Sequence, residues 1–303
     1  MMNKPKIVVV GSINMDLVTE TSTFPSLGET HVGNKFMMLP GGKGANQAVA
    51  CSRLGADVTL IGCIGDDDLG SRMLKNLKKE NVNTTYVETM NGMNTGTASI
   101  TIEDGENRII YVPGANEALT PEKLEQVESV IQKADVLLLQ LETPLETVAA
   151  ATTIAKRYKV PVILNPAPAV QIPEKLIEDI DFLTPNEHEL AIALGYSDNE
   201  LFVQKTLAEY PGKIIMTKGK EGAYYTNSSG VLKNQPTFLA ETVDTTGAGD
   251  TFNAGIAVMV GERQDLNTAV RFATAAGTLS VTKSGAQGGM PHRGVVDHWL
   301  TEN

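Results

Sequence analysis

Short apolar runs alternate with longer amphipathic stretches through most of this 303-residue chain. The apolar runs have the length and β-branched composition of buried parallel strands, and they lie at residues 7–10, 58–61, 136–141, 160–164 and 214–216. Helical patterns separate them at residues 45–54, 69–80, 121–133 and 144–158. This alternation predicts an α/β fold with a doubly wound, mostly parallel sheet that is flanked by helices.

Start signals support one of these helices in particular. Thr143 is a favourable N-cap, Pro144 suits the first turn, and Glu146 completes a capping box. Further along the chain the pattern predicts short strands at residues 222–226 and 231–239, and then two helices at residues 250–260 and 265–283. We therefore expect the second half of the chain to form one wall of a binding pocket.

Two segments interrupt the alternation of strands and helices, at residues 20–39 and 95–112. In the second segment Asp104-Gly105 lies between two β-rich runs, as a hairpin turn does. Together the segments predict a small β-sheet lid, at about residues 15–40 and 95–113 of one domain that spans residues 1–303. One face of such a sheet is apolar and needs cover from substrate, the main domain or another subunit.

Composition narrows the possible partners. The formal net charge of −11 disfavours binding to nucleic acid and to anionic membrane surfaces. The apolar run near the start is too short to span a membrane and has no cleavage site after it, which indicates a cytoplasmic protein. Cys51 and Cys63 lack Cys-x-x-Cys spacing, so they are interpreted as buried structural thiols in a reducing compartment.

The strongest chemical signal lies at residues 243–252, which follow β-rich sequence and open a helical pattern. The small residues Gly247, Ala248 and Gly249 allow the backbone to approach a phosphate, and the helix N-terminus adds positive potential. Asp250 then lies where it could accept the proton of an attacking hydroxyl. Helix capping is the alternative interpretation of the same residue.

Two further polar groups have spacings that suit a sugar. Asn14 and Asp16 follow a predicted strand at its carboxyl end, where open α/β sheets bind ligands, although a stabilised turn explains them as well. In residues 40–47, glycines permit close backbone approach to a polyol and Lys43 adds charge. This segment is not a Walker P-loop, because Gly44 follows the lysine where Ser or Thr is required.

Asn186 and Glu189 lie three residues apart at a predicted helix start. The pair suits a hydrated Mg²⁺ ion near phosphates, because Mg²⁺ keeps several waters and needs few protein oxygens. A solvated acidic helix start is the alternative. His188, between them, is expected at the surface, since no metal-binding motif accompanies it.

Over nearly its whole length the sequence resembles the ribokinase family of carbohydrate kinases. Two signatures carry the resemblance, Gly41-Gly42-Lys43-Gly44-Ala45-Asn46-Gln47-Ala48 and Asp244-Thr245-Thr246-Gly247-Ala248-Gly249-Asp250. The resemblance implies a parallel α/β domain with a β lid, through which two copies form a homodimer. It also implies ATP-dependent phosphorylation of D-ribose at the 5-hydroxyl, giving D-ribose 5-phosphate and ADP.

The resemblance further implies roles for individual residues. Asp250 is the base, and Gly247, Ala248 and Gly249 form the anion hole. The implied sugar contacts are Asn14, Asp16, Gly41, Gly42, Lys43, Asn46, Glu142 and Asp250. The implied nucleotide contacts are Asn186, Thr217, Lys218, Gly219, Lys220, Glu221, Gly222, Gly249 and Thr274. Thr274 replaces a polar aromatic residue that some members have.

The resemblance implies a site for a monovalent cation, in addition to the Mg²⁺ pair that the spacing indicates. A monovalent cation, K⁺, is expected at Asp244, Thr246, Ser280, Lys283, Gly285 and Gly289, largely through backbone carbonyls. Gly289 stands where the family pattern has serine, so one side-chain ligand is absent. Mg²⁺ is expected near Asn186 and Glu189, bound indirectly.

Alternatives within the family are kinases of deoxyribose, fructose or a nucleoside. Asn14, Asp16 and Glu142 favour a neutral polyhydroxylated sugar over an acid, since a substrate carboxylate would meet like charge. A sugar or nucleotide sensor without turnover is the alternative from another class, because a fold does not prove activity.

Overall fold

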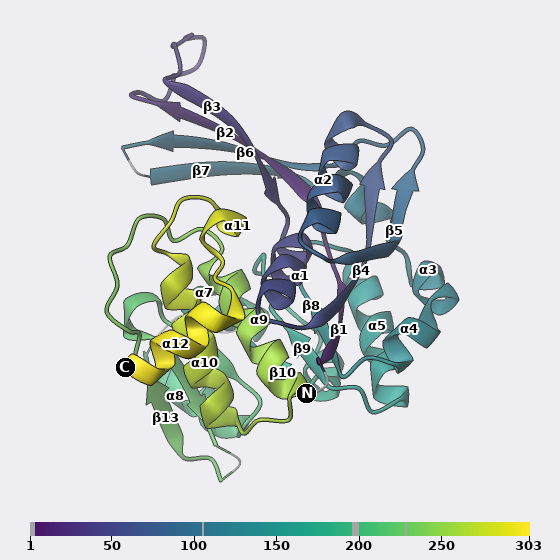
Figure 1. Cartoon of the computed structure of the whole chain (residues 1–303), viewed down its shortest axis with the longest axis vertical. Helices are drawn as coiled ribbons and strands as arrows, with labels where there is room; N and C mark the ends of the chain where they lie inside the picture. Colours follow the sequence, from purple (N-terminus) through teal and green to yellow (C-terminus); the bar gives the residue numbers. More distant parts are fainter. Residues whose placement is uncertain (1–3, 105, 196–199, 228) are drawn as a thin grey trace.

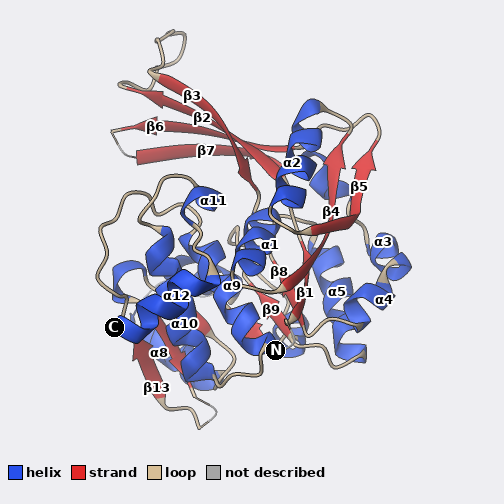
Figure 2. Ribbon diagram, in the orientation of Figure 1, coloured by secondary structure: helices blue, strands red, loops and turns tan. Residues whose placement is uncertain are grey.

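The computed structural model describes residues 4–104, 106–195, 200–227 and 229–303. A six-stranded parallel sheet in the order β10-β9-β8-β1-β4-β5 forms the centre, with helices on both faces (Figures 1 and 2). Its strands are β1 (Lys6–Val10), β4 (Asp57–Gly65), β5 (Asn83–Met90), β8 (Val136–Leu139), β9 (Val162–Leu164) and β10 (Phe182–Leu183). The predicted α/β class is confirmed.

The central strand β1 shows why its sequence is apolar throughout. Ile7 and Val9 belong to one buried cluster, and Val8 and Val10 belong to the other, so the sheet is covered on both faces. The helices that contribute residues to the first cluster are α1 (Lys43–Arg53), α2 (Asp68–Lys79), α9 (Ala248–Gly261), α10 (Leu266–Ser280) and α12 (Arg293–Glu302). The helices that contribute residues to the second cluster are α3 (Pro121–Gln126), α4 (Glu128–Gln132), α5 (Leu145–Arg157), α6 (Glu174–Asp179), α7 (Glu187–Ala193) and α8 (Glu200–Glu209).

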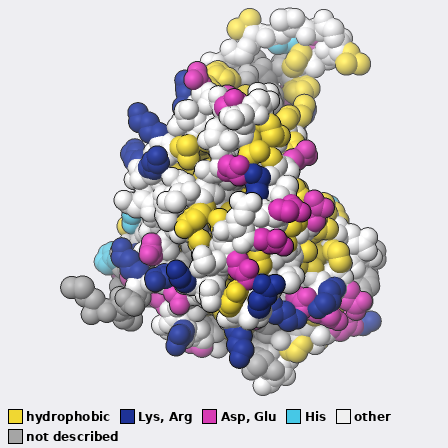
Figure 3. Space-filling view, turned by 90° about the vertical axis from the view of Figure 1, so that its right-hand side faces the viewer, with side chains coloured by type: hydrophobic (Ala, Val, Ile, Leu, Met, Phe, Trp, Pro, Cys, Tyr) yellow, Lys and Arg dark blue, Asp and Glu magenta, His cyan; other side chains and the backbone are white. Residues whose placement is uncertain are grey.

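The two segments that interrupt the alternation form a separate four-stranded sheet, which we call the small sheet. Its order is β3-β2-β6-β7, with β2 (Asn14–Thr21), β3 (Lys35–Gly41), β6 (Gly96–Glu103) and β7 (Glu106–Val112). The small sheet projects from the body of the molecule (Figures 1 and 3). The predicted turn at Asp104-Gly105 falls partly outside the described residues, because Gly105 is not among them.

The predicted strand at residues 214–216 does not continue the main sheet. It becomes β11 (Ile215–Thr217) in a three-stranded antiparallel sheet with β12 (Ala223–Thr226) and β13 (Leu232–Gln235). Two isolated parallel bridges, Leu183 with Ile214 and Asn186 with Thr217, link it to the edge of the central sheet. β13 ends at Gln235 instead of residue 239, because Pro236 has no N–H to donate to a ladder.

Several other boundaries differ from the sequence patterns. The helix expected at residues 121–133 is divided at Val127 into α3 and α4, and α10 ends at Ser280. The N-cap of α5 is Pro144, not Thr143, because Pro144 has extended backbone angles and the helix begins at Leu145. Among the described residues, the buried Thr143 Oγ1 has no hydrogen-bond partner, so the predicted capping box was wrong.

The remaining short elements are α11 (Ala286–Gly289) and the 3₁₀ turns η1 (Gly114–Ala118) and η2 (Gly219–Glu221). No helix in the described part of the chain is long and apolar enough to cross a membrane. Cys51 and Cys63 are both buried and free, as predicted. Burial raises the pKa of the Cys63 thiol to about 11 and also raises that of Cys51, so neither is poised to react.

Candidate active site

The carboxylate of Asp250 is buried in the first turn of α9, at the carboxyl end of the central sheet. Each of its oxygens accepts one hydrogen bond from α1. Asn46 Nδ2 donates to Oδ2 at 3.0 Å, and Gln47 Nε2 donates to Oδ1 at 3.0 Å. Two amides therefore fix the orientation of this carboxylate, and its remaining lone pairs are available to a hydroxyl donor.

Helix α9 begins with the backbone shape that an anion site needs. Its N-cap, Gly247, has φ 79°, a left-handed conformation that favours glycine, and no side chain caps the helix. A Cβ added at Gly249 would meet no atom within 4 Å, so the helix start is open on that side. The Ala248 amide donates to the Thr245 carbonyl at 3.2 Å, which leaves it already engaged within the turn.

A second polar group surrounds Glu142, which follows β8. Glu142 Oε2 accepts hydrogen bonds from Ser12 Oγ at 2.5 Å, Asn14 Nδ2 at 3.2 Å and the Lys43 amide at 3.0 Å. Asp16 lies nearby on β2, and its side chain contacts Gly41, the last residue of β3. A Cβ added at Gly41 would lie only 2.2 Å from Asp16 Oδ1. We call Asn14, Asp16, Lys43 and Glu142 the polar cluster.

Electrostatics tie the polar cluster to Asp250. Burial and the charges of Glu142 and Asp250 raise the pKa of Asp16 to about 7, although Lys43 acts against them. Burial alone lowers the pKa of Lys43, but Asp250, Glu142, Glu189 and Asp16 outweigh burial and raise it. Lys43 therefore stays charged and balances the carboxylates around it.

A cavity of about 910 Å³ lies on the other side of the α9 N-terminus. Ala248 and Gly249 form part of its wall, so the cavity reaches the turn that carries Asp250. Among the predicted nucleotide contacts, those that line it are Asn186, Thr217, Gly219, Lys220, Gly222, Gly249 and Thr274. Lys218 and Glu221 do not line it, and their side chains form an ion pair at 2.9 Å.

Thr274 lies in the wall of this cavity. Its Oγ1 is buried and has no hydrogen-bond partner among the described residues. The cavity is otherwise lined largely by apolar and small side chains, among them Phe238, Leu239 and Phe252, which suits a flat aromatic base.

Comparison with known proteins agrees with this geometry. A model of the pfkB family of carbohydrate kinases matches residues 4–293. The chain belongs to this kinase family. It is 45% identical to a ribokinase of Bacillus subtilis (strain 168), over 97% of this chain and 99% of that relative. It is 41% identical to a ribokinase of Lactococcus lactis subsp. lactis, over 98% of this chain and 97% of that relative.

A solved structure extends the comparison to three dimensions. The structure of Arabidopsis thaliana ribokinase complexed with ribose and ATP is 32% identical, covers 98% of this chain and 99% of that one, and gives a TM-score of 0.90. The predicted family is confirmed, and so is the predicted fold of a parallel α/β domain with a small additional sheet. This chain is a sugar kinase.

The kinase family implies Mg²⁺, which we tested against Asn186 and Glu189. The two residues form a capping box, in which Asn186 Oδ1 accepts from the Glu189 amide at 2.7 Å and Glu189 Oε2 accepts from the Asn186 amide at 2.9 Å. No group of three or more His, Cys, Asp or Glu in the described residues could hold a metal. The arrangement fits only indirect binding, through water and phosphate oxygens.

The segments predicted to hold a monovalent cation come together around the start of α11. Asp244 Oδ1 accepts from the Thr246 amide at 2.9 Å, and its Oδ2 accepts from the Gly285 amide at 2.8 Å. A Cβ added at Gly289 would lie 1.9 Å from the Ser280 carbonyl oxygen and 3.4 Å from the Lys283 carbonyl oxygen. A serine side chain would clash with the Ser280 carbonyl, so this close approach requires glycine at residue 289. A cation held by backbone oxygens of these segments stays a prediction.

Sequence reasoning missed several site residues of this kinase. Asn116 donates to Asn14 Oδ1 at 2.7 Å and accepts from the Ile13 amide at 2.9 Å, and Tyr111 donates to the Glu142 carbonyl at 3.2 Å. The register pairs Asp16 with Ala98 and Ala98 with Tyr111, which places the tyrosine on the Asp16 face of the small sheet. His188 was expected at the surface, and it is exposed, but it also lines the cavity.

Proposed function

We propose that this protein transfers the γ-phosphoryl group of ATP to the 5-hydroxyl of D-ribose, which gives D-ribose 5-phosphate and ADP. The observation that carries the proposal is the position of Asp250, between the polar cluster on one side and the 910 Å³ cavity on the other. The ribokinases among its relatives, one of them described in complex with ribose and ATP, support the same substrates.

The sugar would be held by Asn14, Asp16, Gly42, Lys43 and Glu142, whose carboxylates and amides match vicinal hydroxyls. ATP occupies the cavity, with its phosphates directed at the α9 N-terminus and its base against the apolar wall near Phe238 and Thr274. Asn46 lies between the two sites, where its side-chain amide donates a hydrogen bond to Asp250.

Asp250 accepts the proton of the 5-hydroxyl as that oxygen forms its bond to the γ-phosphorus. The bond from that phosphorus to the bridging oxygen breaks, and ADP leaves with the electron pair. The start of α9 faces the charge that gathers on the transferring group, where helix N-terminal amides are most effective. Bound Mg²⁺ would neutralise phosphate charge, with Glu189 and Asn186 acting through water.

K⁺ in the cradle formed by Asp244, Thr246, Ser280, Lys283, Gly285 and Gly289 would hold the turn that carries the α9 N-terminus. Burial works to raise the pKa of Asp244, but hydrogen bonds from Thr246, Gly285 and Ser284 outweigh it and lower that pKa. The resulting carboxylate charge favours a cation nearby.

The proposal includes one cytoplasmic domain over residues 1–303, a lid formed by the small sheet, and a homodimer through that sheet. Met37, Val18, Ile100 and Ile109 are register partners in one row across the face that carries Asp16. The Ile109 side chain is 55% exposed. Val18 is already buried, so a second copy covering this row would chiefly remove Ile109 from water.

An ADP-release assay tests the proposed function directly. Wild-type protein is given ATP with D-ribose, 2-deoxyribose, fructose or a nucleoside, and the phosphorylated product is identified by ³¹P NMR. The proposal requires the highest kcat/KM with D-ribose. Preference for another acceptor would assign a different kinase of the family, and ligand binding without ADP release from any acceptor would indicate a sensor.

A further inference from the structure

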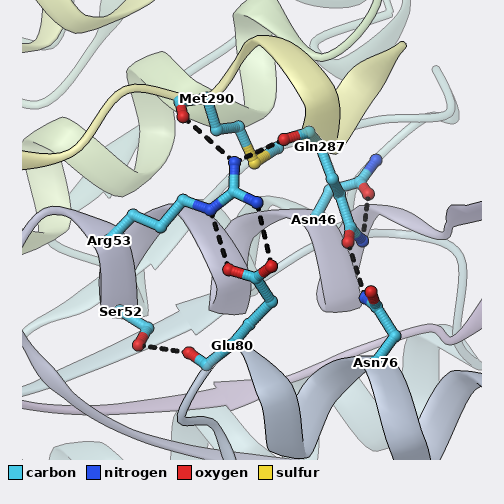
Figure 4. A network of polar contacts seen from close by, with 7 residues as sticks. All are labelled: Asn46, Ser52, Arg53, Asn76, Glu80, Gln287 and Met290. Atoms are coloured by element: carbon cyan, nitrogen blue, oxygen red, sulfur yellow. Dashed lines mark hydrogen bonds and ion pairs between the residues drawn. The ribbon is translucent and has the colours of Figure 1, made fainter.

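A chain of three side-chain amides runs from the side of α2 to the carboxylate of Asp250. Asn76 Nδ2 donates to Gln287 Oε1 at 2.8 Å, and Gln287 Nε2 donates to Asn46 Oδ1 at 3.0 Å (Figure 4). Asn46 Nδ2 in turn donates to Asp250 Oδ2 at 3.0 Å. We propose that Gln287 is a positioning residue, which sets the direction of the hydrogen bond that Asn46 donates to the base. This inference rests on the function proposed above.

The chemistry of the last acceptor fixes the direction of every bond in the chain. An ionised carboxylate can only accept, so Asn46 must turn its NH₂ group toward Asp250 and its oxygen toward Gln287. Gln287 must then turn its NH₂ group toward Asn46 and its oxygen toward Asn76. One reversed amide would therefore reverse the next, and an oxygen of Asn46 would face an oxygen of Asp250.

The backbone of Gln287 is held as firmly as its side chain. Arg53, in the last turn of α1, donates from one nitrogen to the carbonyls of Gln287 and Met290. Its other nitrogens form a two-point ion pair with Glu80, at 2.8 and 3.0 Å. Ser52 Oγ donates to the Glu80 carbonyl at 2.6 Å, so α1, α2 and α11 meet in one polar network (Figure 4).

Burial makes this amide chain sensitive to its partners. Asn46, Gln287 and Asp250 are 6%, 7% and 8% exposed, so water is poorly placed to replace a reversed bond. Asn76, by contrast, is only half-buried and lies three side chains away from the base. A substitution at Asn76 can thus act on the base without removing any group that surrounds the substrates.

The test compares Asn76→Asp with Asn76→Ala. An aspartate accepts where asparagine donates, so it should reverse the amide of Gln287 and then that of Asn46. An alanine removes the contact and leaves the rest of the chain free to keep its direction. We expect Asn76→Asp to lower kcat about tenfold, as one misdirected hydrogen bond of ordinary strength implies, and Asn76→Ala to lower it less than about threefold.

KM for ATP should stay within about twofold in both Asn76 variants, because the cavity is intact. Ser71→Asp, on the exposed part of α2, controls for the added negative charge and should leave kcat unchanged. Melting temperatures identify any variant that loses its fold. If Asn76 had a purely structural role, Asn76→Ala would lower kcat more than Asn76→Asp, since alanine removes every contact of the side chain.

Gln287→Glu and Gln287→Leu repeat the comparison at the proposed positioning residue itself, where Glu forces reversal and Leu does not. If both carboxylate variants, Asn76→Asp and Gln287→Glu, retain at least the kcat of their apolar counterparts, the inference is overturned. The proposed function is judged separately, by the activity of the wild-type protein toward ribose. An inactive wild type would remove that function, whereas an active one with the wrong order of variants would remove only the role of Gln287.

Discussion

The half-buried carboxyl group of Asp16 should make the unliganded protein lose stability as the pH rises. Its pKa is raised from 3.8 to about 7 by burial first and then by the charges of Glu142 and Asp250. At 1.36 kcal/mol for each pKa unit, this difference of about 3 corresponds to a cost of about 4 kcal/mol for the ionised form. Water that enters an open site screens part of that cost, which lowers the expected value to about 2 to 4 kcal/mol.

The sign follows from the order in which the two states ionise. Below pH 3.8 Asp16 is protonated in both the folded and the unfolded chain, so its favourable contribution is fully present. As the pH rises toward 7 the unfolded chain releases the proton first, and the folded state loses stability until Asp16 itself ionises. Asp16→Asn cannot ionise, so its stability advantage should grow by about 0.6 to 2.6 kcal/mol between pH 5 and pH 8.

Urea unfolding of wild-type and Asp16→Asn protein at the two pH values measures this difference. Asp57→Asn, exposed at the start of β4, controls for loss of a carboxylate and should change stability by less than about 0.5 kcal/mol. A stability difference that is the same at pH 5 and pH 8 would refute the raised pKa. Ribose titrations of the same variant should show weaker binding by roughly 1.5 to 3 kcal/mol, which would tie the stability cost to sugar recognition.

Three further outcomes test the rest of the site. Asp250→Asn should lower kcat by about 10²- to 10⁴-fold while calorimetry still detects ribose and ATP binding, and near-normal kcat would remove Asp250 as the base. At equal ionic strength kcat should be higher in K⁺ than in Na⁺ or tetramethylammonium, and equal values would exclude a specific cation site. Ile109→Asp should shift the sedimentation coefficient from dimer to monomer while circular dichroism shows that the fold is kept, whereas a monomeric wild type would contradict the proposed interface.

Much of the fold could be predicted from the sequence because local pattern and tertiary burial agree there. Residues 7–10 are apolar at every position since both faces of β1 are covered, and this is the pattern that indicates a parallel sheet. At Thr143 and Pro144 the local capping preference was overruled, because the chain enters α5 with Pro144 extended. Residues 214–216 have the composition of a central strand, and only their antiparallel partner β12 places them in another sheet.

The candidate site shows a similar division between local and tertiary information. Asp250, Asn46 and the glycines around them are marked by two dense motifs, so their proximity could be anticipated. Gln287 and Asn116 could not be selected in this way, since their importance comes from side chains more than 100 residues away. Asn186 and Glu189 illustrate the converse, because a capping box and a metal-binding pair have the same spacing in sequence.

The hydrogen bond from Asn46 to Asp250 joins residues 204 positions apart, and this separation has a meaning for biosynthesis. A ribosome that adds about 5 to 20 residues per second needs roughly 10 to 40 s to extend the chain from the first residue to the second. By the later part of that interval the nascent chain contains Asn14, Asp16, Lys43 and Glu142, but it still has neither the proposed base Asp250 nor helix α9. A chain that ends before Asp250 therefore lacks part of the proposed phosphotransfer site. That site is assembled only when most of the polypeptide has been made.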